Sequence, residues 1–403
     1  METGESQIKG IPAEESERIL SSMPDIRIEG FTGINLFHSK PVKKFLITAL
    51  LTIVPFVSAW AQEMKHFFYR GLPYGSEATF NPISLLVNGG FDELQVYEFS
   101  HSVSQIPWKI GSRNVWKNIS APFSQINKYG WERFLRYEIF PTTLNSRNAQ
   151  YFPNYTLHLI GGGMVSRKIS EWYDAHGYPV PRILGALTTM SYHYINEIIE
   201  AGGGEFCSNV DPIADLLIFD PLGIILFNFD GVSEFFSENF SLNDWSMQPA
   251  ASFNPLTFRN LCQGFVMKYP ITSSGKTSLL YHFGIFGIVG LSFKTSDDES
   301  ISFGAGVASK RVYTSDTRNG TITKSIVVCP MAGVYWDRNN SLLASLVVCD
   351  SFYELVRLNL FPGSFNVFSV TPGFFIGIGE RGKCTLGLNL SILPMGICVH
   401  HPK

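Results

Sequence analysis

The chain has 403 residues, which is enough for one large core or two domains. Its 31 basic and 34 acidic residues leave no basic excess of the size that nucleic acid binding needs, so we expect no nucleic-acid partner. Charged residues make up only 16% and aromatic residues 14%, a balance that favours contact with lipid over part of the surface. No uncharged run of about 20 apolar residues follows residue 62, which argues against a polytopic helical membrane protein.

The segment Lys43–Gln62 has the layout of a secretory signal. Lys43 and Lys44 form its positive end, Phe45–Val57 is its apolar part, and Ala59-Trp60-Ala61 places small residues at the cleavage positions. We therefore predict that residues 1–61 are a leader and signal peptide, with an uncleaved membrane anchor as the alternative.

The cysteines form no metal-binding or redox motif. None of the six lies in a C-x-x-C pair, so zinc ribbons and thioredoxin-like sites are not expected. An exported chain could pair some of them, or they could fill space as small apolar side chains. The six are Cys207, Cys262, Cys329, Cys349, Cys384 and Cys398.

Residues 62–153 are predicted to be a loop-rich N-terminal region. Asn, Pro and Gly are frequent, and one stretch near Pro82–Tyr97 looks like a strand. Tyr129–Phe140 predicts a short amphipathic helix, because Trp131 and Phe134 share one face. That helix fits a membrane surface or a protein core equally well.

Residues 154–245 are predicted to be a helical domain of about three helices. Three consecutive glycines, Gly161-Gly162-Gly163, lie inside the first helix, where each costs about 1 kcal/mol. They indicate the close approach of another helix or a break. The third helix is expected to be interrupted at Pro221. The predicted helices span Thr156–Asp174, Arg182–Ala201 and a third segment that begins at Asp211.

From about Arg259, large apolar residues alternate with small or polar ones. Leu386, Leu388 and Leu390 alternate with Gly387 and Asn389. The same alternation continues from Tyr281 to Phe293, and short turn sequences separate such runs.

Long alternating strands behind a signal peptide are typical of a transmembrane barrel. We therefore predict an α+β fold, in which the helical segment is followed by an antiparallel, outer-membrane-type β-barrel of about eight strands over residues 246–403. A soluble sandwich or barrel is the alternative.

Ionisable residues in the apolar helical segment are candidates for chemistry. His193 and Glu197 are four residues apart and share one helix face. Histidines clustered with carboxylates bind metals or act as general acids and bases. Neither His-Glu-x-x-His nor Gly-x-Ser-x-Gly occurs, so no motif names a metal or cofactor. Buried polar groups that only fix helix packing, or a partner surface, are the alternatives. The candidate catalytic residues are His158, His193, Glu197 and Asp215.

The same residues carry a resemblance to a known family. The segment resembles a domain of unknown function found in exported envelope proteins of Gram-negative bacteria, in which a polar-studded helical segment precedes a β-rich part. The sequence departs from the family at Asn196, where tryptophan is expected, and at Phe227-Asn228, where Gly-Glu is expected. The matching positions are Asn154, His158, Gly161, Glu197, Asp215-Leu216 and Gly223.

Together these features predict an outer-membrane or envelope-associated protein with a structural or accessory role, a barrel that carries a helical plug or cap. Its expected partners are membrane lipid and an envelope protein, and its location is the outer membrane or the periplasm. The alternative is an envelope enzyme that modifies lipid or glycan through the His/Glu/Asp cluster. A channel is the weakest hypothesis, because the small inward residues suit a filled interior.

Overall fold

The computed structural model describes most of the chain after the predicted leader. The described residues are 64–96, 102–141, 152–203, 210–253, 255–316, 322–350, 354–365 and 371–401. Residues 64–403 form one compact unit. The predicted signal peptide and Cys207 lie outside the described residues.

The N-terminal region is largely helical, where loops, one strand and a short helix over Tyr129–Phe140 were expected; helical turns do occur within that last segment. The strand predicted near Pro82 is wrong, since α4 begins there. A helix starts here because the side chain of Asn81 accepts hydrogen bonds from the backbone N–H groups of Ile83 and Ser84. Pro82 occupies the first turn, where its missing N–H is tolerated. The helices here are α3 (Gly75–Ala78), α4 (Pro82–Phe91), η2 (Asp92–Gln95), η3 (Val103–Gln105), α5 (Trp108–Ser120), α6 (Pro122–Tyr129), α7 (Trp131–Phe134) and the π-helical η4 (Leu135–Ile139).

The central helices lie where the sequence predicts them. At Pro221 the third helix does not stop. A π-helical turn precedes the proline, which then sits in the first turn of α11, where a missing N–H is tolerated. The elements are the π-helical η5 (Tyr155–Gly162), α8 (Gly163–Ala175), α9 (Pro181–Glu200), η6 (Ala201–Gly203), α10 (Asp211–Ala214), the π-helical η7 (Asp215–Phe219), α11 (Asp220–Phe227) and α12 (Asp230–Asn239).

The three consecutive glycines allow these helices to approach one another closely. A Cβ atom on Gly163 would lie 2.6 Å from the Phe227 ring and 2.8 Å from the carbonyl oxygen of Gly223. A Cβ atom on Gly162 would lie 2.9 Å from Cε1 of His193. Close approach, one of the two reasons considered for tolerating these glycines, is therefore the one that applies.

The C-terminal half forms one sheet of thirteen strands, where about eight were expected. One cause is that the alternation from Tyr281 to Phe293 continues across a turn, so that it contains two strands, β5 and β6. The strands are β1 (Asn243–Asp244), β2 (Ala250–Phe253), β3 (Leu256–Arg259), β4 (Phe265–Pro270), β5 (Thr277–Phe283), β6 (Phe286–Lys294), β7 (Glu299–Asp316), β8 (Ile322–Arg338), β9 (Ser341–Cys349), β10 (Val356–Leu360), β11 (Pro372–Ile378), β12 (Cys384–Leu390) and β13 (Gly396–His401).

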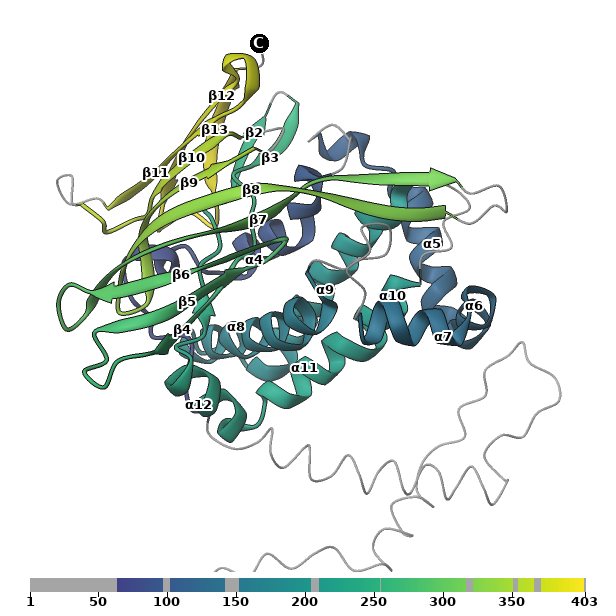
Figure 1. Cartoon of the computed structure of the whole chain (residues 1–403), viewed down its shortest axis with the longest axis horizontal. Helices are drawn as coiled ribbons and strands as arrows, with labels where there is room; N and C mark the ends of the chain where they lie inside the picture. The colour runs from purple at the N-terminus through teal and green to yellow at the C-terminus, as the bar shows by residue number, and fades with distance from the viewer. Residues whose placement is uncertain are drawn as a thin grey trace, which may run out of the picture. The chain divides into compact units, whose positions relative to one another are not determined.

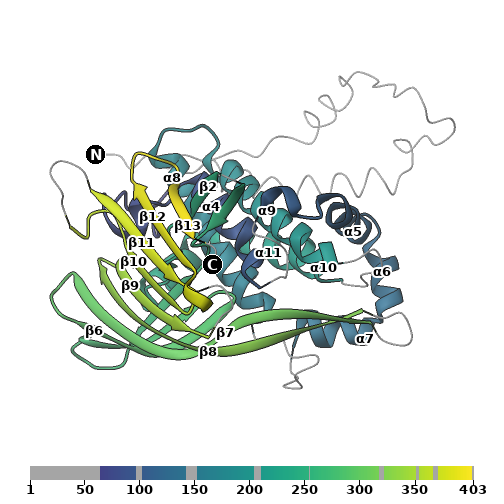
Figure 2. The same ribbon diagram turned by 90° about the horizontal axis from the view of Figure 1, so that it is seen from above.

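Within the sheet, strands β4 to β13 follow one another in chain order. The order continues from β13 to β2 and β3, and β1 lies beside β4 at the other end. Neighbouring strands are antiparallel except for β13 and β2, which are parallel. A mixed α+β fold with C-terminal strands is therefore confirmed. Figures 1 and 2 show the sheet bending, with α4, α9 and α11 on the side towards which it bends.

The four short strands β1 to β4 belong to one hairpin. Asn243 pairs with Val266, and Ala250 pairs with Arg259 in the same register. Between these pairs, the Trp245 N–H donates to the Gly264 carbonyl at 2.8 Å. The Met247 N–H likewise donates to the Cys262 carbonyl at 3.0 Å. We call residues 243–266 the joining hairpin.

Both faces of the joining hairpin are buried, except at its tip, where Phe253 and Leu256 are exposed. Trp245, Met247 and Cys262 join a core made only of residues from the hairpin and the sheet. On the opposite face, Leu261 and Phe265 pack in clusters with residues of the helices. The helices therefore cover the outer side of the hairpin.

Among the described residues, no single helix is both long enough and apolar enough to cross a bilayer. The segments Asp211–Phe227 and Asp230–Asn239 meet the criteria only together, and they are bent by 86°.

Replacement of Gly163 tests the close helix packing. Gly163→Ala is expected to destabilise the fold by about 1–3 kcal/mol, because the new methyl group meets backbone atoms of Gly223. Gly231→Ala is the matched control: a methyl group there would have no described atom within 4 Å, so the change should be neutral or stabilising by up to about 1 kcal/mol. Urea unfolding of both variants measures the difference, and equal stabilities would contradict the packing described.

Candidate functional site

Three buried side chains from three helical segments meet at one carboxylate. His158 lies in η5, His193 in α9, and Asp220 is the first residue of α11. Nδ1 of His158 lies 2.9 Å from Oδ1 of Asp220. Nδ1 of His193 lies 2.6 Å from the same oxygen. The two imidazole rings are 4.5 Å apart, and both nitrogens approach the same oxygen, but only that of His158 makes a hydrogen bond with it.

A second pair of acids lies beside this group. Oδ2 of Asp215 is 3.6 Å from Nε2 of His158, on the side of the ring away from Asp220. Glu197 hydrogen-bonds the carboxyl group of Asp215. Asp215 and Glu197 are both almost fully buried. The helical segment therefore holds three carboxyl groups and two imidazoles in one apolar setting.

The surroundings shift the pKa values of Asp220 and Asp215 in opposite directions. Burial alone raises the pKa of Asp220, but the charges of His193 and His158 and the close approach of their nitrogens outweigh burial and bring the pKa to about 2. Burial raises the pKa of Asp215 well above its usual value, and the nearby acids Asp211 and Glu197 raise it further. Asp220 is therefore ionised at neutral pH, whereas the surroundings of Asp215 favour its protonated form.

The two histidines also differ. Burial lowers the pKa of His158, but the charge and hydrogen bond of Asp220, with the charges of Asp211 and Glu200, together outweigh burial and raise the net pKa. Burial lowers the pKa of His193, and the charge of His158 lowers it further. The surroundings thus favour a protonated His158 paired with Asp220, and a neutral His193. A neutral imidazole beside a charged one is an arrangement suited to proton transfer or metal ligation.

A small cavity of about 50 Å³ opens beside the two histidines. It is also lined by Asn196, Glu200 and Gln263. A cavity of this volume has room for water molecules and lies next to the imidazoles. The cluster therefore borders a small polar space.

Another buried ion pair is explained by structure alone. Glu171 accepts hydrogen bonds from the backbone N–H groups of Phe67, Phe68 and Tyr69, at 2.8–2.9 Å. Arg167 pairs with Glu171 at 2.9 Å. Together the two side chains fix the N-terminal segment on α8.

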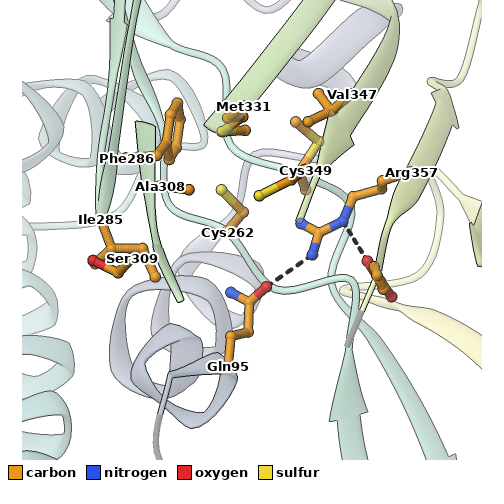
Figure 3. Close-up of a pocket in the computed structure, with 12 residues that line it drawn as sticks. Gln95, Cys262, Ile285, Phe286, Ala308, Ser309, Met331, Val347, Cys349 and Arg357 are labelled. Carbon is orange, nitrogen blue, oxygen red and sulfur yellow. Dashed lines mark hydrogen bonds and ion pairs between the residues drawn. The ribbon is translucent and has the colours of Figure 1, made fainter. Parts of the chain in front are cut away.

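A second cavity, of about 60 Å³, lies between the sheet and η2 (Figure 3). Sulfur atoms of Cys262, Cys349 and Met331 point towards its centre. The guanidinium of Arg357 donates to Gln95 at 2.8 Å, to the Leu261 carbonyl at 3.0 Å and to Glu354. Because the arginine is already paired, the cavity offers no free charge to a ligand, and we assign it no function.

No protein-family model, curated protein or solved structure matches this chain. The resemblance to the envelope family of unknown function therefore stays a prediction.

The four predicted site residues are brought together. His158, His193, Glu197 and Asp215 all belong to the cluster described above. The residue at its centre, Asp220, was not selected from the sequence. The signal that could have found it was an acid directly before a proline inside a long apolar run, which marks a costly buried charge. Catalysis by these residues stays a prediction.

The assigned charge states predict unequal effects of two similar substitutions. Asp220→Asn is expected to cost about 3–5 kcal/mol of stability, because it leaves the charge of His158 buried without its partner. Asp215→Asn should cost about 1 kcal/mol or less, since an amide can replace a protonated carboxyl group. Thermal and urea unfolding of both variants provide the comparison. Equal losses would show that the charges are assigned wrongly.

Asp92 lines the same cavity, and its raised pKa predicts that the stability of the fold depends on pH. Burial raises its pKa to about 7, and the charge of Glu200 contributes. The folded chain then keeps a proton that the unfolded chain releases above about pH 4. Stability should therefore fall as the pH rises from about 4 to 7, by on the order of a few kcal/mol. Asp92→Asn cannot ionise and should lack this part of the slope, which urea unfolding across that range measures; identical slopes would refute the assignment.

Proposed function

We propose that this chain is an outer-membrane or envelope-associated protein of structural or accessory role whose sheet faces lipid. One observation carries the proposal: a single row of directly paired residues, one from each strand from β4 to β13, is apolar throughout. We call this row the apolar belt. Its members are Tyr269, Leu279, Leu291, Phe303, Val334, Leu346, Leu358, Ile376, Leu386 and Val399.

The belt is exposed over most of its length. Eight of its ten side chains are exposed, from 38% at Ile376 to 68% at Val399. Ten strands spaced by about 4.8 Å give a continuous apolar band of roughly 50 Å. Soluble proteins rarely leave such a surface uncovered, whereas a lipid-facing sheet requires it.

The next paired row, which faces inwards, is mixed: it holds small and polar residues together with the buried apolar residues Leu280 and Val347. Gly290, Gly304 and Gly333 pair with one another, followed further along by Arg357 and Thr385. Lys268, at the β4 end of this row, forms an ion pair of 2.6 Å with Asp337. Exposed apolar residues outside, with small and polar residues among those that face inwards, fit the pattern of transmembrane barrels.

We further propose that the sheet closes into a barrel through the joining hairpin. The hairpin pairs with β13 on one side and with β5 on the other, so it links the two ends of the strand order. Counting β1 with β2 and β3 with β4 as single strands reduces thirteen strands to eleven. An odd number of up-and-down strands can close only with one parallel pair, and β13 with β2 is that pair. This arrangement supports a barrel of eleven strands in place of eight.

The helical unit suits the role of a cap better than that of a plug. The hydrophobic core inside the bend of the sheet includes Trp245 of the joining hairpin and contains no residue of the helices. The helices instead cover the joining hairpin from outside. A lateral cover would also leave this part of the sheet out of contact with lipid, and would offer a surface to an envelope partner.

The second candidate function is an envelope enzyme that acts on lipid or glycan. It is favoured by the His158–Asp220–His193 cluster beside its cavity. In that role His158 or His193 would be the general base, and Asp220 would orient the imidazole. Loss of a lipid or glycan product in a strain that carries His193→Gln, with unchanged protein abundance, would support it. An unchanged lipid and glycan profile in a deletion strain would oppose it.

Arginine placed in the apolar belt tests the main proposal. Val334→Arg is expected to destabilise the protein by about 2–4 kcal/mol in phospholipid vesicles, because the charge would sit in the hydrocarbon layer. At a water-facing position the same change should stay within about 0.5 kcal/mol. Urea unfolding in vesicles, with membrane fractionation and heat-modifiable gel mobility, provides the measurement.

Asp297→Arg is the matched control, because Asp297 is exposed in the turn between β6 and β7. It should leave stability in vesicles unchanged. A Val334→Arg variant as stable as this control, or a wild-type chain that stays in solution without detergent, would overturn the proposal.

A further inference from the structure

We propose that His158, His193 and Asp220 form a binding site for one divalent first-row transition metal ion. This inference is independent of whether the sheet faces lipid. Each of the three side chains offers one ligand atom, and these atoms lie within 4.8 Å of one another.

The donor atoms are already close to coordination distances. Metal–ligand bonds of about 2.0–2.2 Å place tetrahedral ligand atoms roughly 3.3 Å apart. Nδ1 of His158 and Nδ1 of His193 lie 2.9 Å and 2.6 Å from Oδ1 of Asp220. A small outward shift of the three side chains would admit the ion.

One oxygen of the central carboxylate is left over. Oδ2 of Asp220 is buried and has no hydrogen-bond partner within the part of the chain that the structure describes. A buried carboxylate oxygen without a partner is costly, and both imidazoles converge on the other oxygen. A cation at this point would use the carboxylate and both nitrogens together, which explains the convergence better than hydrogen bonding does.

The backbone around the site is also unusual. His158 lies within the π-helix η5, and Asp220 directly follows the π-helix η7. Short π-helical turns inside α-helices are rare and occur frequently at functional sites. Here they adjust the direction of two of the three ligand side chains.

The donor set indicates the class of ion. Two imidazoles and one carboxylate suit Zn²⁺, Fe²⁺ or Co²⁺, whereas Ca²⁺ and Mg²⁺ prefer oxygen ligands. The cavity beside His158 and His193 provides space for a water molecule as a further ligand. Asp215, 3.6 Å from Nε2 of His158, occupies the place where metal sites usually hold a carboxylate that orients the ligating histidine.

The test uses the purified full chain after treatment with EDTA. Co²⁺ titration should give one equivalent per chain, with the visible absorption of a tetrahedral or five-coordinate ion. Zn²⁺ should abolish that absorption stoichiometrically, and Mg²⁺ should not. Zn²⁺ should also raise the melting temperature of the chain.

Variants identify the ligands. His193→Gln should weaken Co²⁺ binding by about 100-fold or more, a larger loss than changes to residues that only orient the ligands cause. His193→Cys should retain binding and add a sulfur-to-cobalt charge-transfer band that the wild-type chain lacks. This new band would be informative even if His193→Gln did not fold. His66→Asn and His401→Asn, at partly exposed histidines elsewhere, should leave binding unchanged.

The result that would overturn the proposal is a folded wild-type chain that gives only the absorption of aqueous Co²⁺. Equal binding by the wild-type chain and a folded His193→Gln variant would also overturn it. Loss of binding on changing His66 or His401 would place the ion elsewhere.

Discussion

The constraint on which the structure depends is the burial of the joining hairpin on both faces. One face supplies Trp245 and Met247 to the core of the sheet, and the other packs Phe265 and Leu261 against the helices. A buried hydrogen bond of 2.7 Å from Lys168 of α8 to Asn243 adds a polar tie between the two parts. Because the hairpin is buried on both faces below its exposed tip, the helical unit and the sheet cannot separate without exposing a core.

Within the helical unit, close packing and buried charge depend on each other. Gly163 and Gly223 let η5, α8 and α11 approach closely enough for His158 to reach Asp220. That contact offsets the cost of burying an ionised carboxylate among apolar helices. A larger residue at either glycine would therefore disturb packing and charge pairing together. The same coupling would hold a metal ion rigidly, since its ligands come from three segments that cannot move independently.

The proposed lipid contact and the proposed metal site occupy different parts of the molecule. The apolar belt lies on the outer face of β4 to β13, whereas the histidines lie in helices beyond the joining hairpin. Charged groups are therefore kept away from the surface proposed to meet hydrocarbon, where each would cost several kcal/mol. If both proposals hold, the sheet fixes the protein in the membrane and the helical cap presents the chemistry beside it.

The sequence alone determined the features that depend on local periodicity. It predicted the positions of the three central helices, the alternation of the C-terminal strands and four members of the charged cluster.

The sequence did not predict features that depend on tertiary contacts. α4 was taken for a strand because its burial against α9 and the joining hairpin removes the usual polar face, and Asn88 there bonds Met247 and Cys262 of the hairpin. β5 and β6 were merged because a tight turn need not interrupt alternation. Asp220 was overlooked because only the packing of three helices brings residues 62 positions apart, His158 and Asp220, into contact. The sequence shows whether apolar residues recur every two or every 3.6 residues. Which strand and helix faces contact one another depends on how the elements pack in the folded chain.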